Sequence, residues 1–156
     1  MKLVQRELIK TNYYALDKKN CLDEMVELLY ENEIIKSQDE FLAAILEREN
    51  MMSTGIGRNI AIPHARGRFV SEMRLAIFVL NNELDYNSID DEPVKLIFMI
   101  AIPADESNNY MKVLAAISNF CHSDENREKL MNASNEDEVY EILKTLSVDL
   151  AESKGE

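Results

Sequence analysis

Apolar residues recur at helical spacing in the first third of the chain. The repeating residues are Leu22, Met25, Val26, Leu28 and Leu29. Their spacing predicts an amphipathic helix over residues 18–31. Ser37 and Glu40 form a capping box directly before a second apolar stretch, so we expect a second helix over residues 38–49.

The same spacing returns in the last third of the chain. We expect helices over residues 109–120 and 126–131, followed by a last helix that Ser134 caps. The residues expected to face inward are Met111, Leu114, Ile117 and Phe120 in the first of these helices and Val139, Ile142, Leu143 and Leu146 in the last.

Two apolar runs between these regions are too short, and too rich in β-branched and aromatic residues, to favour helices. Residues 74–80 (RLAIFVL) and 94–102 (VKLIFMIAI) predict strands that are buried on both faces. A short strand over residues 60–62, closed by Pro63, is expected before them, and another around residues 84–86. Because helices precede and follow the strands, the pattern predicts an α/β layered sandwich, with helices on both faces of a mixed β-sheet.

The composition is that of an ordinary globular protein. Of 156 residues, 46% are hydrophobic and 29% charged, and we expect one domain over residues 1–148 with a polar C-terminal tail over residues 149–156. The longest apolar run, residues 96–102, is far shorter than the roughly 20 residues of a membrane helix, and the N-terminus lacks the apolar stretch of a secretory signal. We therefore expect a soluble, cytoplasmic protein in which Cys21 and Cys121 are reduced packing residues.

Charge is distributed unevenly along the chain. The net charge of −12 argues against nucleic acid as a partner, because nucleic-acid binding depends on a basic surface. Residues 48–74 nevertheless carry five arginines and only two glutamates, a local balance of +3. The arginines are Arg48, Arg58, Arg66, Arg68 and Arg74. Such a cluster indicates an anionic ligand or an acidic partner surface, since the guanidinium group suits phosphate and carboxylate; chance grouping of solvated side chains is the alternative.

The candidate chemistry lies in residues 53–66, STGIGRNIAIPHAR. Gly55 and Gly57 are not followed by the residues of a nucleotide-binding loop, which favours glycines that supply positive φ or let backbone approach closely. A metal site is not favoured, because His64 has no second histidine or cysteine nearby. A catalytic triad of Ser53 and His64 would lack a carboxylate within the motif.

Two interpretations of His64 remain open, a solvated loop histidine and a phosphoryl acceptor. Pro63 stiffens the backbone before it, and a neutral imidazole is a good phosphoryl acceptor near pH 7. Nearby arginines would lower the pKa of His64 and could hold phosphoryl oxygens in the transition state. His122 directly follows Cys121 and is expected to be a surface or helix-end histidine.

Arg48 and Glu49, then STGIG, then IAIPHAR resemble in order and spacing the signature of enzyme IIA of the sugar phosphotransferase system, fructose/mannitol type, including its nitrogen-regulatory branch. The similarity extends from about residue 5 to 145. It implies a mixed sheet of about five strands, no nucleotide or metal cofactor, and a phosphohistidine at the tele nitrogen, Nε2, of His64. Arg48 would stabilise the phosphoryl group. The implied phosphoryl loop consists of Ser53, Thr54, Gly55 and Gly57.

The resemblance also implies partners. His64 would receive the phosphoryl group from the phosphocarrier HPr and pass it to a cysteine of a IIB protein or domain during sugar uptake. Association with a membrane permease would be peripheral, through the IIB and IIC components. The alternative is a nitrogen-type regulatory protein, in which the phosphorylation state of His64 controls binding to other proteins. The sugar and the oligomeric state stay open.

The chain departs from the family pattern at one position. The family often has a second histidine near the start of the helix that follows the strand over residues 94–102. Here NNYMKVL places Tyr110 at that position, with Asn109 as the less favoured candidate. A tyrosine hydroxyl could hydrogen-bond the phosphoryl group or His64. His122 is a poor substitute, because twelve residues of continuous helix span about 18 Å.

Overall fold

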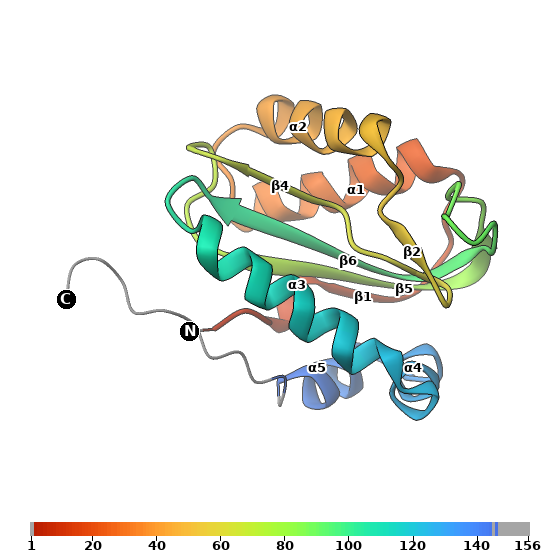
Figure 1. The fold of residues 1–156 in the computed structure, drawn as a ribbon. Helices are drawn as coiled ribbons and strands as arrows, with labels where there is room; N and C mark the ends of the chain where they lie inside the picture. Colours follow the sequence, from red (N-terminus) through yellow and green to blue (C-terminus); the bar gives the residue numbers. More distant parts are fainter. Residues whose placement is uncertain (1, 145, 147–156) are drawn as a thin grey trace.

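A six-stranded mixed β-sheet forms the centre of the computed structural model, which describes residues 2–144 and 146 (Figure 1). The strands are β1 (Ile9–Tyr13), β2 (Gly55–Gly57), β3 (Ile60–Ala61), β4 (His64–Gly67), β5 (Arg74–Leu84) and β6 (Val94–Pro103). Their order is β1-β5-β6-β3-β2, and β4 also pairs with β6. The β1–β5, β3–β6 and β4–β6 pairs are parallel, whereas the β5–β6 and β2–β3 pairs are antiparallel.

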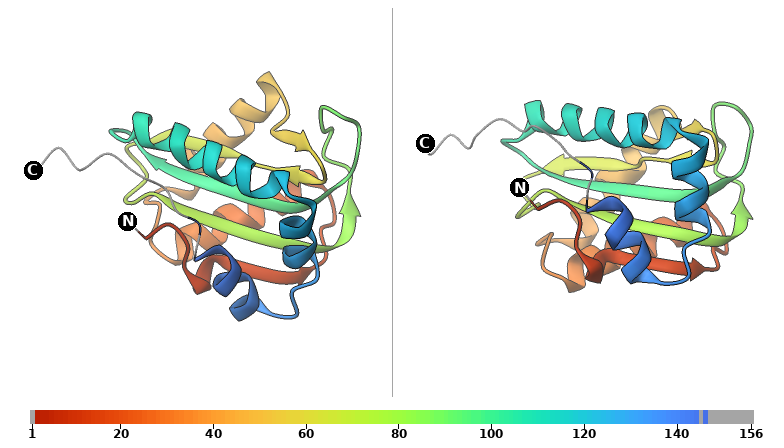
Figure 2. Two further views of the ribbon diagram at one scale, coloured as in Figure 1. Left: turned by 60° about the horizontal axis from the view of Figure 1, so that its bottom comes forward. Right: turned by 90° about the horizontal axis from the view of Figure 1, so that it is seen from below.

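Helices cover both faces of the sheet, as the sequence predicts. The helices are α1 (Lys18–Glu31), α2 (Gln38–Met51), α3 (Ser107–His122), α4 (Asp124–Met131) and α5 (Glu136–Leu143), and a 3₁₀ turn, η1 (Arg6–Leu8), precedes β1. In Figure 1, α1 and α2 lie above the sheet and α3, α4 and α5 below it, and the views of Figure 2 agree. The α/β sandwich with a mixed sheet is therefore confirmed, with six strands where about five were expected.

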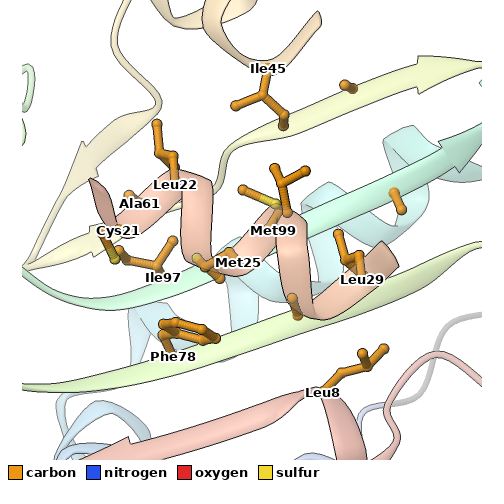
Figure 3. Packing of buried hydrophobic residues seen from close by; sticks show 14 of the residues in the cluster. Leu8, Cys21, Leu22, Met25, Leu29, Ile45, Ala61, Phe78, Ile97 and Met99 are labelled. Atoms are coloured by element: carbon orange, nitrogen blue, oxygen red, sulfur yellow. The ribbon is translucent and has the colours of Figure 1, made fainter. Parts of the chain in front are cut away.

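Two hydrophobic clusters, one on each face of the sheet, form the core. Successive residues of a strand point to opposite faces, so β6 contributes to both clusters. Ile97 and Met99 join the cluster under α1 and α2, which Figure 3 shows, whereas Phe98 and Ile100 join the cluster under α3 and α5. This explains why β6 reads as a continuous apolar run rather than an alternating one.

Several local expectations differ from the structure. The short strands β1, β2 and β4 were not predicted, and Leu84 ends β5 instead of starting a separate strand. Met111 is 57% exposed, because α3 buries the stripe Val113, Ile117 and Cys121 instead. Asn135, not Ser134, caps α5, since its side chain accepts a hydrogen bond from the backbone N–H of Glu138. The predicted tail, residues 149–156, lies outside the described residues.

The two cysteines are buried in separate parts of the core. Cys21 packs in the cluster under α1 and α2, and Cys121 packs in the cluster under α3 and α5. Burial raises the pKa of each thiol to about 12. Both are therefore free thiols held in the unreactive protonated form, in line with the prediction that they are packing residues.

Candidate functional site

Pro63 separates two short strands that run along the same side of β6. Ile60 and Ala61 of β3 pair with Leu96 and Ile97, and the chain then resumes pairing at His64, which lies opposite Ile100 at the start of β4. The carbonyl oxygen of Pro63 accepts a hydrogen bond from the backbone N–H of Ile100 (2.9 Å). The interruption of strand pairing at Pro63 thus places His64 in an edge strand, β4, whose pairing with β6 fixes the His64 backbone.

The hydrogen bonding of His64 determines which ring nitrogen is available. Its Nδ1 lies 2.9 Å from the carbonyl oxygen of Ile62. Because a carbonyl oxygen can only accept, Nδ1 must carry the proton in this contact. In the neutral ring, Nε2 then keeps its lone pair, which is the property that a phosphoryl acceptor needs.

The surroundings of His64 favour its neutral form. Burial of the partly buried ring lowers the pKa of His64, and the positive charge of Arg48 lowers it further. The hydrogen bond to Ile62 and the negative charge of Glu49 act in the opposite direction, without reversing the shift. The sequence predicted the direction of this shift, but the largest cause is burial rather than like-charge repulsion from the arginines.

A cavity of about 390 Å³ adjoins His64 and combines side chains from α2, α3, β4 and β6. It is lined by Ala44, Glu47, Arg48, Met51, His64, Ala65, Arg66, Ile102 and Tyr110. The Tyr110 ring lies 5.8 Å from the His64 ring, centroid to centroid, at an interplanar angle of 37°. The structure therefore brings together the three residues expected to act in catalysis, and it brings Tyr110 rather than Asn109 to the cavity.

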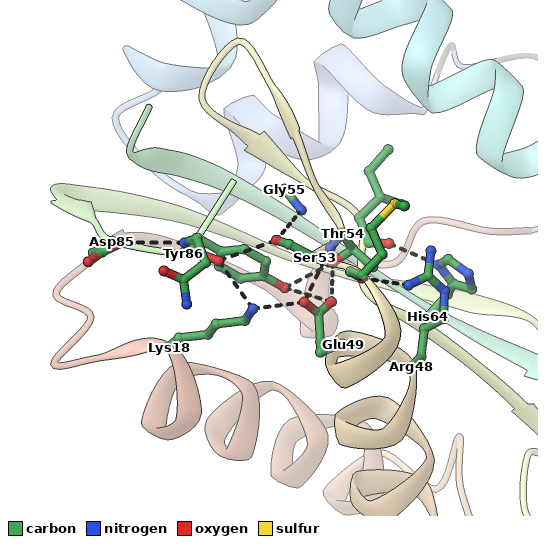
Figure 4. Close-up of polar contacts among 12 residues, drawn as sticks. Lys18, Arg48, Glu49, Ser53, Thr54, Gly55, His64, Asp85 and Tyr86 are labelled. Atoms are coloured by element: carbon green, nitrogen blue, oxygen red, sulfur yellow. Dashed lines mark hydrogen bonds and ion pairs between the residues drawn. The ribbon is translucent and has the colours of Figure 1, made fainter. Parts of the chain in front are cut away.

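Arg48 is held at this cavity by the turn that follows α2. Its Nη1 donates a hydrogen bond to the carbonyl oxygen of Met52 (2.7 Å), and Figure 4 shows its guanidinium group beside His64. The remaining N–H groups of the guanidinium keep a fork geometry that suits phosphoryl oxygens.

The four residues of the expected phosphoryl loop do not line this cavity. The Ser53 hydroxyl donates to the carbonyl oxygen of Tyr86 (3.3 Å), and the Thr54 hydroxyl donates to Glu49. A Cβ atom on Gly55 would lie 2.4 Å from the Ser88 hydroxyl oxygen. Gly55 therefore permits a close approach between its own backbone and Ser88, which lies in the connection between β5 and β6.

Gly57 has the other property that the glycines were expected to supply. Its φ of +102° lies in the region that favours glycine. It ends β2, ahead of the turn that leads into β3. A direct role of residues 53–57 in holding a phosphoryl group stays a prediction.

The arginines of the expected positive cluster are divided among different parts of the fold. A role of this cluster in binding an anionic ligand or an acidic partner surface stays a prediction. Arg48 and Arg66 line the cavity, whereas Arg74 pairs with Glu72.

Arg58 donates from Nη1 to the carbonyl oxygen and to Nδ1 of His122, the last residue of α3 (3.1 and 2.7 Å). The prediction that His122 is a helix-end histidine is confirmed.

Sequence reasoning did not identify Glu49 as a residue of the site. Glu49 is buried and receives four hydrogen-bonding or ionic contacts from Lys18, Thr54 and Tyr86. The only available signal was its place beside Arg48 in the family-like motif. Its partners are spread over residues 18 to 86, so no local pattern could have predicted them.

The described part of the chain contains neither a metal-binding cluster nor a membrane-spanning helix. No group of three or more histidine, cysteine, aspartate or glutamate side chains there is arranged to hold a metal ion. None of the helices in that part combines the length and apolar composition needed to cross a membrane.

Comparison with known proteins gives a consistent result across nearly the whole chain. The family described as "Phosphoenolpyruvate-dependent sugar phosphotransferase system, EIIA 2" matches residues 2–146. A fructose-specific EIIABC component of Bacillus subtilis is 35% identical over 141 residues, which are 90% of this chain and 22% of that protein. The chain thus spans about a fifth of that relative's length.

Solved structures agree with the family match. The nitrogen regulatory protein IIA-Ntr of Neisseria meningitidis superposes with a TM-score of 0.83 at 27% identity, covering 89% of this chain and 94% of that one. The mannitol IIA of Escherichia coli, solved in complex with phosphorylated mannitol IIB, shares the fold at a TM-score of 0.77 and 22% identity, covering 92% and 97%. The chain belongs to the EIIA 2 family of the phosphoenolpyruvate-dependent sugar phosphotransferase system.

Proposed function

We propose that this chain is a phosphocarrier that accepts a phosphoryl group from phospho-HPr on Nε2 of His64 and passes it to a IIB component during sugar uptake. The observation that carries the proposal is the hydrogen bond from Nδ1 of His64 to Ile62, which leaves the Nε2 lone pair free beside Arg48. The lowered pKa of His64 keeps this lone pair unprotonated at neutral pH.

The proposed transfer moves the phosphoryl group from a donor histidine to His64. The lone pair on Nε2 of His64 forms a bond to phosphorus while the phosphorus–nitrogen bond to the donor histidine breaks, and its electron pair returns to the donor ring. Arg48 holds the phosphoryl oxygens, whose charge is spread in the transition state. The Ile62 carbonyl keeps Nδ1 protonated and so fixes the ring while Nε2 carries the group. In the transfer to a IIB component, a cysteine thiolate attacks the phosphorus, and the bond between phosphorus and Nε2 of His64 breaks.

The relatives support both the general role and the acceptor. Members of this family are EIIA components of a phosphotransferase system. The Bacillus relative's name joins the A, B and C components in one fructose-specific protein, and the E. coli mannitol IIA was solved bound to phosphorylated IIB. For this chain, HPr as the donor, a IIB component as the acceptor and peripheral contact with a permease are part of the proposal.

A regulatory role is the second candidate. It is favoured by the similarity to the Neisseria nitrogen regulatory protein IIA-Ntr. In this role, His64 would still be phosphorylated, but the phosphorylation state would control binding to another protein. The same cavity serves both roles, so they differ in what happens after His64 is modified.

The test is phosphorylation of the purified chain by phosphoenolpyruvate and the upstream carriers, followed by mapping of the modified residue. We expect one acid-labile phosphate on His64, none on a His64→Ala variant, and full labelling of a His122→Ala control. Persistent labelling of the folded His64→Ala variant would contradict the proposal.

A second step separates the two candidates. The phosphorylated chain is mixed with IIB components, and transfer to the IIB cysteine is followed over time. Rapid transfer supports the transport role. A stable phosphorylated form that transfers to none of them, but changes its binding to a regulatory protein, supports the alternative.

A further inference from the structure

A buried carboxylate that the proposed transfer does not use lies beside Arg48. Glu49 follows Arg48 in α2 and is 8% exposed. One of its oxygens, Oε1, lies 2.9 Å from the Lys18 ammonium nitrogen and accepts from the backbone N–H of Thr54 (3.2 Å). The other, Oε2, accepts from the hydroxyls of Thr54 and Tyr86, the latter at 3.2 Å. Figure 4 shows these donors converging on Glu49 from separate parts of the chain.

The hydrogen bonds and ion pair of Glu49 hold the turn over residues 51–54, which side-chain packing does not hold. Met51 and Met52, which follow the Arg48–Glu49 pair, are 76% and 64% exposed, so their burial contributes little to holding the turn. The carbonyl oxygen of Met52 is nevertheless the acceptor for Arg48 Nη1. Two residues later, Thr54 ties the chain back to Glu49 through both its backbone N–H and its hydroxyl. The position of the Arg48 guanidinium therefore depends on a turn that Glu49 anchors.

The other partners of Glu49 tie the same turn to the rest of the fold. The Lys18 ammonium group donates to the carbonyl oxygen of Tyr86 (3.1 Å) and lies 4.2 Å from the centroid of that ring. The Ser53 hydroxyl donates to the same carbonyl oxygen. Because a buried charge is stable only when it is paired and hydrogen-bonded, these groups and Glu49 depend on one another. The end of α2 is thus fixed to the start of α1 and to the segment after β5.

The negative charge of Glu49 also acts on the imidazole ring of His64. It raises the pKa of His64, against the effects of burial and of Arg48. A residue that both anchors the Arg48 turn and contributes to the field at His64 is placed to influence transfer without touching the phosphoryl group.

We propose that Glu49 is a positioning residue that acts through Arg48. By anchoring the turn over residues 51–54, it keeps the guanidinium group where it can hold phosphoryl oxygens opposite His64. The kinetic part of this inference rests on the proposed function. The positional part concerns the Arg48 side chain alone and needs no phosphoryl donor to be tested.

The positional part is tested by nitrogen-15 NMR of the Arg48 side chain. The heteronuclear NOE of its Nε–Hε group should be that of an ordered side chain in the unmodified protein and should fall in a Glu49→Gln variant, which keeps the size of the side chain but removes its charge. Glu27→Gln, an exposed glutamate on α1, is the matched control and should leave the signal unchanged. An unchanged Arg48 signal in the folded Glu49→Gln variant would overturn the inference.

The kinetic part is tested by a double-mutant cycle between Arg48 and Glu49. Glu49→Gln should slow phosphoryl acceptance on the order of tenfold to a hundredfold, because small displacements of a positioning group are costly. In an Arg48→Ala background the same substitution should change the rate by less than about twofold, because no guanidinium is left to misplace. Equal losses in both backgrounds would show that Glu49 does not act through Arg48.

A milder variant covers the case in which Glu49→Gln does not fold. Thr54→Val removes the hydroxyl that donates to Glu49 but keeps the shape of the side chain and the backbone donor. It should produce a smaller loss of Arg48 order and of rate, and an ordered, fully active Thr54→Val protein would contradict the inference. If the unmodified protein is never phosphorylated at His64, the proposed function fails, and the NMR result still decides the position of Arg48.

Discussion

The protein places an arginine beside a histidine in two separate regions. His64 shares the cavity with Arg48, near the Tyr110 end of α3, whereas His122 is the last residue of α3 and contacts Arg58. Both pairs put a cation next to an imidazole. Only in the first pair does the neutral imidazole keep a free lone pair on Nε2, and the difference lies in the hydrogen bond at Nδ1.

At His64 the Nδ1 group donates to a backbone carbonyl, while at His122 Nδ1 accepts from the guanidinium group of Arg58. Arginine can only donate, so the neutral His122 ring must carry its proton on Nε2. It therefore has no free lone pair while the contact with Arg58 persists. A backbone acceptor leaves the Nε2 lone pair of the neutral His64 ring available, and a side-chain donor makes His122 a hydrogen-bond acceptor that ties the β2–β3 turn to α3.

Substitution of Arg48 should slow the transfer whereas substitution of Arg58 should not, and this difference is the largest effect we expect. Arg48→Ala should slow phosphoryl acceptance by His64 about 10²- to 10³-fold, the usual loss when one oriented donor to a developing negative charge is removed. Arg58→Ala should leave the rate unchanged. Both rates are measured with labelled phospho-HPr under single-turnover conditions.

Arg48→Lys distinguishes charge from geometry in this comparison. Lysine keeps the positive charge but lacks the planar fork, so the rate should fall while thermal stability stays nearly the same. An Arg48→Lys protein with the rate of the unmodified chain would show that the arginine is structural and would remove the proposed distinction between the two pairs.

The comparison also shows what the sequence could and could not predict. The helix over residues 18–31 and the strand over residues 94–102 were predicted almost to the residue, because each depends on a local pattern of buried positions. His64 was singled out as a candidate because Pro63, the glycines and the nearby arginines give a local motif, and its role as phosphoryl acceptor stays a proposal. The hydrogen-bond partner of Arg58 was not predictable, because Arg58 lies six residues before His64 in the sequence but contacts His122 across the fold.

The short strands were missed for a related reason. The strand β4, His64–Gly67, carries no alternation of polar and apolar residues, and it exists because β6 supplies its hydrogen-bond partners. β1 is a polar strand with one fully buried residue, Ile9, beside the long apolar β5. Pairing of such strands depends on tertiary context rather than on propensity.

The pH dependence of His64 should sharpen the comparison. Because burial and Arg48 lower the pKa of His64, its neutral form should persist below the ordinary histidine pKa of about 6.5. The acceptance rate should therefore hold as the pH falls through that value. Imidazole NMR titration measures this directly, and Arg48→Met, which removes the cation, should raise the pKa of His64 while His122→Ala leaves it unchanged.

The same shift predicts a loss of stability in acid. A histidine whose pKa is lower in the folded than in the unfolded state binds fewer protons when folded, so unfolding takes up protons as the pH falls below about 6.5. The His64 contribution to folding stability should therefore decline in that window. Urea unfolding of the unmodified protein and of His64→Gln at pH 8 and pH 5.5 checks this. Equal losses in the two proteins would show that His64 is not the group responsible.

The Arg58–His122 pair should matter for stability alone, and modestly. Arg58→Ala removes two hydrogen bonds at a largely exposed position and should lower the free energy of unfolding by about 0.5–1 kcal/mol. Urea unfolding measures the loss, with Arg68→Ala as an exposed control. The loss should shrink when His122 is already alanine, because one of the two hydrogen bonds is then absent.

Tyr110 should give the smallest effect and tests how much the missing second histidine matters. Its ring faces His64 at a centroid distance of 5.8 Å, so packing against the imidazole depends on the ring and not on the hydroxyl. Tyr110→Phe keeps that ring and should change the acceptance rate by less than about tenfold, since a single neutral hydrogen bond contributes at most about 1.5 kcal/mol. Tyr110→Ala, which also removes the ring, should cost more, because His64 then becomes more exposed. A Tyr110→Phe rate as low as that of Arg48→Ala would instead make the tyrosine hydroxyl a direct partner of the phosphoryl group, filling the place of the second histidine.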